Sequence, residues 1–194
     1  MVSKSVLLGA SLVVLGIIGI LGVVALGPKQ VLGMDEAESI ATNYLKSFGG
    51  SDIQVKEIME FQINYYVEYK ERSTGLGAFE MLIDKQTGSI YPEYGPNMMW
   101  NLKYGHGGMM GGWSTPPSAQ MSVSASQAKT IAQGYLDGAY PGSVAEEVNQ
   151  FYGYYTVHIT KSGTLFGMLS VNGSSGVVWY HSWHGAYIQS REIS

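Results

Sequence analysis

Methionine, histidine and tryptophan are concentrated in two stretches of the chain, and their side chains could bind a soft metal ion. One stretch is the glycine-rich segment 93–120, and the other is residues 179–185. Thioether sulfur selects Cu(I), whereas imidazole binds Cu(I), Cu(II), zinc or nickel. We therefore predict a copper site with ligands drawn from Met98, Met99, His106, Met109, Met110, His181 and His184.

The same residues allow a second interpretation. Methionine fills irregular gaps in cores and forms adaptable protein-binding surfaces, so segment 93–120 could be packing or partner surface instead. Ligands without thiolate favour loose, exchangeable binding, as in metal delivery or sensing. His158 lies within an expected strand and is interpreted as an ordinary sheet residue.

The sequence contains no motif of the common catalytic, disulfide or phosphate-binding sites. The chain has no cysteine, which excludes disulfides, thiolate metal sites and a cysteine nucleophile. It contains no G-x-S-x-G, no H-E-x-x-H and no phosphate loop ending in Lys-Ser/Thr. The acidic pairs Glu146/Glu147 and Glu60/Glu68 are expected to be solvated positions. We predict that the protein is not an enzyme.

Composition and charge limit the classes of protein to which the chain can belong. The 194 residues carry a net charge of -4, and no run of Lys or Arg suggests a nucleic-acid partner. Only 13% of the residues are charged, whereas Gly (26) and Tyr (14) are abundant. This composition indicates a folded, turn-rich protein rather than a disordered chain.

Residues 5–27 form an uncharged apolar run that is long enough to cross a bilayer. Lys4 precedes the run, and Asp35 and Glu36 follow it, so the positive-inside rule places the C-terminal body outside the cytoplasm. We predict a single-pass anchor in the cell membrane, contacting lipid through residues 5–27. A cleaved signal peptide and a pilin-like leader are the alternatives. Pro28 would be poorly placed after a cleavage site.

An internal repeat describes the rest of the chain. Five apolar positions with the spacing of one helical stripe occur twice, and each stripe is expected to pack against its own sheet. The two sets are Ala37, Ile40, Ala41, Tyr44 and Leu45, and Ala128, Ile131, Ala132, Tyr135 and Leu136.

Strand-like segments follow each helix, so the predicted fold class is α+β, with a helix packed on a small antiparallel sheet in each of two units. Since a lone unit of this size would be marginally stable, the two are expected to pack together. The expected strands are 53–59, 61–71, 78–83 and 89–91 in the first unit, and 145–149, 152–160, 165–171 and 177–180 in the second. The predicted domains are 1–32 (anchor and linker), 33–92 (unit 1), 93–120 (connector) and 121–194 (unit 2).

The motifs of both units resemble the PepSY domain. The pattern A-x-x-I-A-x-x-Y-L, aromatic strands, and then [DN]-x-x-[ST]-G-x-[IV] covers residues 33–92 and 121–181. The resemblance implies a non-catalytic module that binds or inhibits protein partners outside the cytoplasm. Such domains occur in propeptides of secreted metallopeptidases and in membrane-bound regulators of cell-wall hydrolases. The family supplies no site residues, and no peptidase domain follows in this chain.

The predicted function is therefore a membrane-anchored, extracytoplasmic interaction module that regulates or escorts an unidentified protein partner. The first alternative is a copper-binding or copper-delivery protein that uses the methionines and histidines. The second is an accessory structural subunit of a membrane complex.

Overall fold

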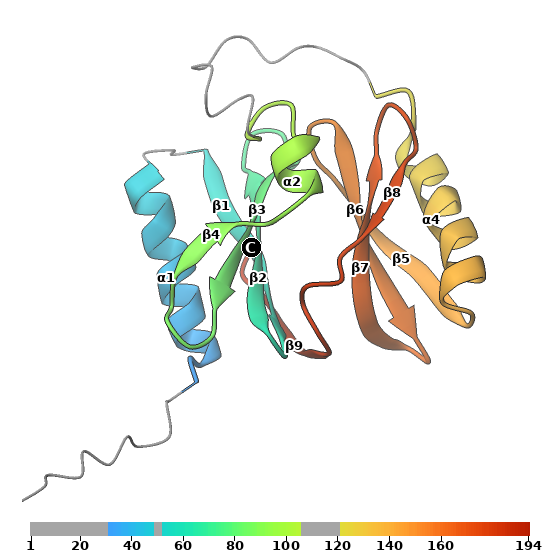
Figure 1. Cartoon of the computed structure of the whole chain (residues 1–194). Coiled ribbons are helices and arrows are strands. Elements are labelled where there is room, and N and C mark those ends of the chain that lie inside the picture. The colour runs from blue at the N-terminus through green and yellow to red at the C-terminus, as the bar shows by residue number, and fades with distance from the viewer. Residues whose placement is uncertain (1–30, 49–51, 106–120) are drawn as a thin grey trace, which may run out of the picture.

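Two helices enclose two antiparallel sheets that lie face to face (Figure 1). The structure is a computed structural model that describes residues 31–48, 52–105 and 121–194. Within these ranges no helix is long and apolar enough to cross a membrane. The predicted span, residues 5–27, lies outside the described residues. The predicted α+β class is confirmed, with the layers ordered helix, sheet, sheet, helix.

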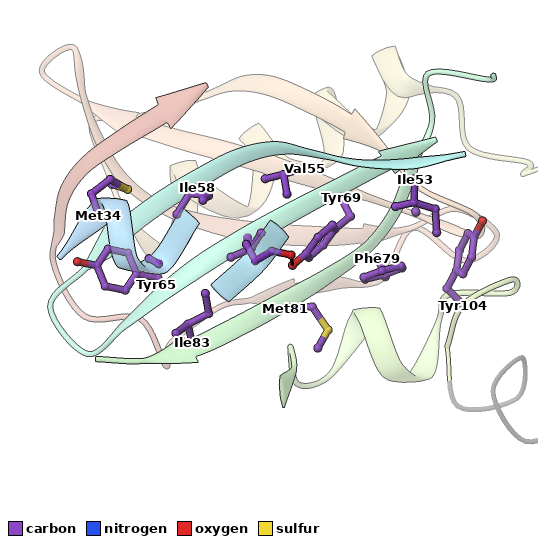
Figure 2. Close-up of a cluster of buried hydrophobic side chains, with 14 residues drawn as sticks. Met34, Ile53, Val55, Ile58, Tyr65, Tyr69, Phe79, Met81, Ile83 and Tyr104 are labelled. Carbon is purple, nitrogen blue, oxygen red and sulfur yellow. Dashed lines mark hydrogen bonds between the residues drawn. The ribbon is translucent and has the colours of Figure 1, made fainter. Parts of the chain in front are cut away.

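Helix α1 covers the outer face of the first sheet. Ala37 and Ala41 of its apolar stripe are fully buried, and Ile40, Tyr44 and Leu45 pack partly buried against the same core. Figure 2 shows this core, in which aromatic and aliphatic side chains of the sheet gather beneath the helix. The sheet has the order β4-β3-β2-β1-β9, in which β9 is the C-terminal strand Tyr187–Glu192. The elements are α1 (Met34–Phe48), β1 (Ile53–Phe61), β2 (Asn64–Glu71), β3 (Gly77–Asp84) and β4 (Ile90–Pro92).

The second unit repeats this arrangement with α4 on a sheet of order β5-β6-β7-β8. Ser124 and Gln127 form the expected capping box at the start of α4. Of the predicted stripe, Ala128, Ala132 and Leu136 are fully buried, and Ile131 is partly buried. The elements are α4 (Ala125–Ala139), β5 (Ser143–Gln150), β6 (Tyr154–Lys161), β7 (Thr164–Asn172) and β8 (Val178–Tyr180).

One member of that stripe does not behave as predicted. Tyr135 remains 36% exposed, and its ring lies beside that of Tyr140 at a centroid distance of 6.3 Å. Its position at the edge of the stripe lets the ring lie across the helix end instead of entering the core.

Two elements were not predicted from the sequence. Helix α2 (Pro96–Met99) is a single turn that follows β4. Strand β9 (Tyr187–Glu192) leaves the second unit and pairs antiparallel with β1, in a register that runs from Glu57↔Glu192 to Phe61↔Tyr187. The C-terminal segment therefore completes the sheet of the first unit.

The inner faces of the two sheets meet, so the units pack together as expected. Gly77 of β3 forms a bridge with Phe151, and a Cβ atom on Gly77 would lie 2.5 Å from the Phe151 ring. In the sequence, Tyr65, Val67 and Tyr69 alternate with more polar neighbours, which predicts a strand buried on one face only. Strand β2 is instead buried on both faces, because α1 covers one face of the first sheet and the second sheet covers the other.

Candidate functional site

The interface between the sheets contains an unusual number of ionisable side chains. Glu68, Glu80 and Glu93 come from the first unit and are at most 2% exposed. His158 and His181, from the second unit, are at most 5% exposed. Burying a charged group is costly unless it is paired and hydrogen-bonded, so the partners of these groups determine what the interface can do.

Glu93 is the centre of the first cluster. It is the first residue after β4, whereas His181 and His184 lie in the segment that connects β8 to β9. Glu93 Oε1 lies 3.2 Å from His181 Nδ1 and 3.0 Å from His184 Nε2. All three side chains are buried, at 0%, 3% and 2% exposure respectively. The packing of the two sheets thus brings two imidazoles onto one carboxylate.

The far nitrogen of each imidazole has its own partner. His184 Nδ1 lies 2.9 Å from Asn64 Oδ1, and Asn64 Nδ2 donates to the carbonyl of Trp183. An amide oxygen can only accept, so His184 Nδ1 carries the proton and the neutral ring presents a lone pair on Nε2 toward Glu93. His181 Nε2 lies 2.9 Å from Ser170 Oγ, which can accept its proton in the same way.

The Glu93 carboxylate and the imidazole nitrogens that face it lie close together but lack well-formed hydrogen bonds. Among the described residues, Glu93 Oε2, His181 Nδ1 and His184 Nε2 are buried without a well-formed hydrogen bond. Trp183 Nε1 donates to Glu93 Oε1 at 3.2 Å. Burial raises the pKa of Glu93, but the attraction of the nearby histidines, His181 above all, outweighs burial and holds the pKa below its usual range. Burial lowers the pKa of His184, which favours the neutral ring.

Aromatic rings enclose the two histidines. Trp183 stacks on His181 with ring centroids 4.8 Å apart, and Phe61 stacks on His184 at 4.5 Å. Tyr66 contacts His184 edge-on. These contacts hold both imidazole planes and reduce the access of water to the Glu93 carboxylate.

A second cluster joins Glu57, Glu68 and His158, whose ligand-type atoms all lie within 4.8 Å of one another. Here the chain supplies its own cation. Lys56 Nζ lies 3.3 Å from Glu68 Oε2 and donates to Asn149 Oδ1 at 2.7 Å. Burial raises the pKa of Glu68 to about 7, although Lys56 opposes this shift.

One sequence-based expectation about this second cluster is wrong. Glu68 was expected to be solvated and is only 2% exposed, because the second sheet covers the inner face of the first sheet. His158 lies in β6, as expected, and its side chain is buried with Nδ1 3.4 Å from Glu147 Oε2.

Glu80 forms hydrogen bonds to side chains of both sheets. Its Oε1 accepts hydrogen bonds from Tyr66 at 2.6 Å and Thr156 at 2.7 Å, and its Oε2 accepts one from Tyr154 at 2.7 Å. Burial and the nearby Glu93 carboxylate raise the pKa of Glu80 well above its ordinary value.

The structure distributes the predicted copper ligands over different environments. His181 and His184 meet at Glu93, a residue that sequence reasoning missed. Met98 is half-buried in α2, whereas Met99 is 67% exposed. His106, Met109 and Met110 lie outside the described residues. The repeat could have revealed Glu93. Asp84 and Asn172 are equivalent residues of the two units, and Glu93 follows Asp84 at the same distance as His181 follows Asn172.

Comparisons with known proteins give little further information. No protein-family model matches the chain, and no curated protein is significantly similar to it. The C-terminal domain of Bacillus megaterium YpeB is 15% identical, with a TM-score of 0.30, over 80% of this chain and 64% of that domain. A candidate lipoprotein from Clostridium difficile 630 is also 15% identical, with a TM-score of 0.25, over 86% of this chain and 96% of that protein. The chain thus spans less than two thirds of the YpeB domain.

Proposed function

We propose that the protein is a PepSY-like, extracytoplasmic and non-catalytic module that binds a protein partner. The duplicated helix-on-sheet unit and its two sets of motifs support the PepSY part of the proposal. The observation that carries the binding role is an exposed patch of large apolar side chains, which we call the aromatic surface. It consists of Tyr91, Tyr94, Met99, Trp100 and Trp179.

The aromatic surface joins α2 and its flanking residues to β8. The rings of Trp100 and Trp179 lie 5.9 Å apart, edge to face, and those of Tyr91 and Tyr94 lie 5.8 Å apart. Gly95 connects the two pairs, since a Cβ atom there would lie 3.2 Å from the Trp179 ring. The surface thus includes side chains from both units of the repeat.

The exposure of these side chains is high for their size. Met99 is 67% exposed, Tyr94 is 50% exposed and Trp179 is 37% exposed. By contrast, the outer faces of α1 and α4 present polar residues such as Asn43 and Lys129. Clustered apolar exposure marks interaction sites, and aromatic residues and methionine are enriched in the cores of protein interfaces. A partner with an apolar face fits this surface best.

Site-specific photo-crosslinking in intact cells tests the proposal. A photoreactive amino acid replaces Met99, and the same residue at Lys129, on the outer face of α4, is the matched control. We expect one discrete protein adduct from position 99 and none from position 129, and Trp179→Ser should abolish the adduct. Equal labelling at both positions would contradict a dedicated surface. Stoichiometric membrane subunits in the adduct would favour the accessory-subunit alternative.

Copper delivery is the second candidate function, and the 67% exposure of Met99 favours it over a buried structural role for that thioether. The test is a Cu(I) competition titration against a chromogenic chelator. The variant replaces Met98, Met99, Met109 and Met110 with leucine, which keeps most of the apolar bulk but removes sulfur. Equally poor competition by wild type and variant would eliminate this candidate.

A further inference from the structure

We infer that Glu93, His181 and His184 form a binding site for one divalent first-row transition metal ion of the Zn²⁺ class. The inference goes beyond partner binding by the aromatic surface and stands or falls independently of it. The site would link the end of the first sheet to the segment that carries the chain from β8 to β9.

The spacing of the three side chains suits such an ion. Their ligand-type atoms all lie within 4.8 Å of one another, and the Glu93 oxygen is 3.2 Å and 3.0 Å from the two nitrogens. Tetrahedral zinc with bonds of about 2.0–2.1 Å places neighbouring ligand atoms about 3.3 Å apart. Small side-chain shifts would therefore bring one carboxylate oxygen and two imidazole nitrogens around a single ion.

The surroundings of the histidines match those of metal ligands. Ligating histidines usually donate their second ring N–H to an oxygen acceptor, which fixes the tautomer and the ring plane. Asn64 Oδ1 accepts the Nδ1–H of His184, and Ser170 Oγ can accept the Nε2–H of His181. The Asn64 contact turns the His184 lone pair toward Glu93, and Ser170 does the same for His181 when it accepts the Nε2 proton.

Among the described residues, no lysine or arginine forms an ion pair with the cluster. In the described part of the chain, Glu93 has ion-pair contacts with His181 and His184 only. The neighbouring cluster differs, because Lys56 already contacts Glu68 there. When both rings are neutral and turn their lone pairs toward Glu93, these lone pairs and the carboxylate repel one another, and a divalent cation would replace that repulsion with coordination. It would also satisfy the three buried atoms that have no well-formed hydrogen bond.

The donor set determines which ion fits. Two imidazoles and a carboxylate suit zinc and its neighbours, whereas Cu(I) prefers sulfur ligands. A surface hollow lined by Tyr180, Ser182 and Gly185 adjoins His181, whose side chain is itself buried. Three protein ligands leave a fourth coordination position for water or for Glu93 Oε2.

Cobalt titration of the full chain in detergent, stripped of metal with a chelator, tests the site. Co²⁺ in a tetrahedral N/O site absorbs in the visible range, and Zn²⁺ should displace it. We expect one Co²⁺ per chain in wild type and at least a 100-fold loss of affinity in Glu93→Gln and His184→Gln. His158→Gln, in the neighbouring cluster, is the matched control and should bind Co²⁺ like wild type.

Thermal unfolding of the wild type keeps the inference testable if a variant does not fold. Zn²⁺ should raise Tm in a concentration-dependent way, because an ion that binds only the folded state stabilises it, whereas Mg²⁺ should not. No visible Co²⁺ absorbance together with no Zn²⁺-dependent Tm shift would overturn the inference. So would loss of binding in His158→Gln with wild-type binding in His184→Gln.

Discussion

Glu93 and His181 occupy the same position in the two copies of the repeat, and their side chains lie 3.2 Å apart. Each is the first residue after the last strand of its unit. The backbone N–H of Glu93 donates to the backbone carbonyl of Glu80, and that of His181 donates to the backbone carbonyl of Met168, both at 3.0 Å. Equivalent positions of the duplicated unit therefore face each other across the sheets with complementary chemistry.

A second pair of equivalent positions in the two units also meets between the sheets. Glu80 pairs with Glu68 in the first sheet, and Met168 pairs with His158 in the second, so Glu68 and His158 are also equivalent. Their ligand-type atoms again lie within 4.8 Å of each other. Identical residues at such positions would place two acids or two histidines together. The divergence of the two units into acid and histidine avoids that repulsion.

The core beneath α4 should be sensitive to truncation. Leu136 is fully buried, so Leu136→Ala should lower the free energy of unfolding by about 2–5 kcal/mol through lost burial and an unfilled cavity. Tyr135→Ala, at the neighbouring position that is 36% exposed, is the control and should cost clearly less. Urea denaturation measures both. Equal losses would contradict the assignment of the buried stripe.

The close approach of the two sheets should exclude side chains at Gly77. A methyl group there would meet the Phe151 ring at 2.5 Å, so Gly77→Ala should destabilise the fold by about 1–3 kcal/mol through overpacking. Gly134→Ala is the matched control, because no atom lies within 4 Å of its added methyl and helix α4 should gain up to about 1 kcal/mol. Thermal or urea unfolding distinguishes the two signs, and a neutral Gly77→Ala would show that the sheets lie further apart.

Stability should depend on pH through Glu68. Its pKa rises from an ordinary value of 4.5 to about 7 on folding, chiefly because of burial, against the attraction of Lys56 and His158. The folded state therefore binds a proton more tightly than the unfolded state. The resulting stabilisation is complete below pH 4.5 and is lost as the pH rises through 7.

Glu68→Gln isolates this contribution from the other groups of the cluster, Lys56, Glu57, Glu147 and His158. The glutamine cannot ionise, so the fall in the free energy of unfolding between pH 4.5 and 7 should be smaller in the variant than in wild type. Urea denaturation across that range measures the difference. Parallel pH profiles for the two proteins would show that Glu68 is ionised at neutral pH at no cost in stability.

The Glu80 network should contribute to the docking of the two sheets. Tyr154→Phe removes the donor to Glu80 Oε2 and should cost about 1–3 kcal/mol, because a buried carboxyl oxygen loses its partner. Tyr155→Phe removes a hydrogen bond to the Val123 carbonyl within the second unit and should cost about 1 kcal/mol. Unfolding measurements compare the two. A smaller effect for Tyr154→Phe would argue against a structural role for Glu80.

The local elements could be predicted from the sequence because local periodicity determines them. The stripe through Ala37 and Ala41 predicted α1, and its repeat through Ala128 and Ala132 predicted α4. The strands before and after each hairpin followed from alternation and turn residues. The predicted copper site combined ligands from segments 93–120 and 179–185, and Glu93 and His181 of these two segments do lie together.

Only the tertiary structure decided which residues of the segments after β4 and β8 contact each other. Glu93 carried no signal of its own, because a lone glutamate after a strand usually points to solvent, and the methionine-rich segment drew the prediction instead. Strand β9 was missed because its residues are largely exposed and lack a clear alternation. The packing of one sheet on the other buried the second face of each sheet. That burial made Glu68 an interior group instead of the expected solvated one, and it enclosed Glu93 and the histidines between the sheets.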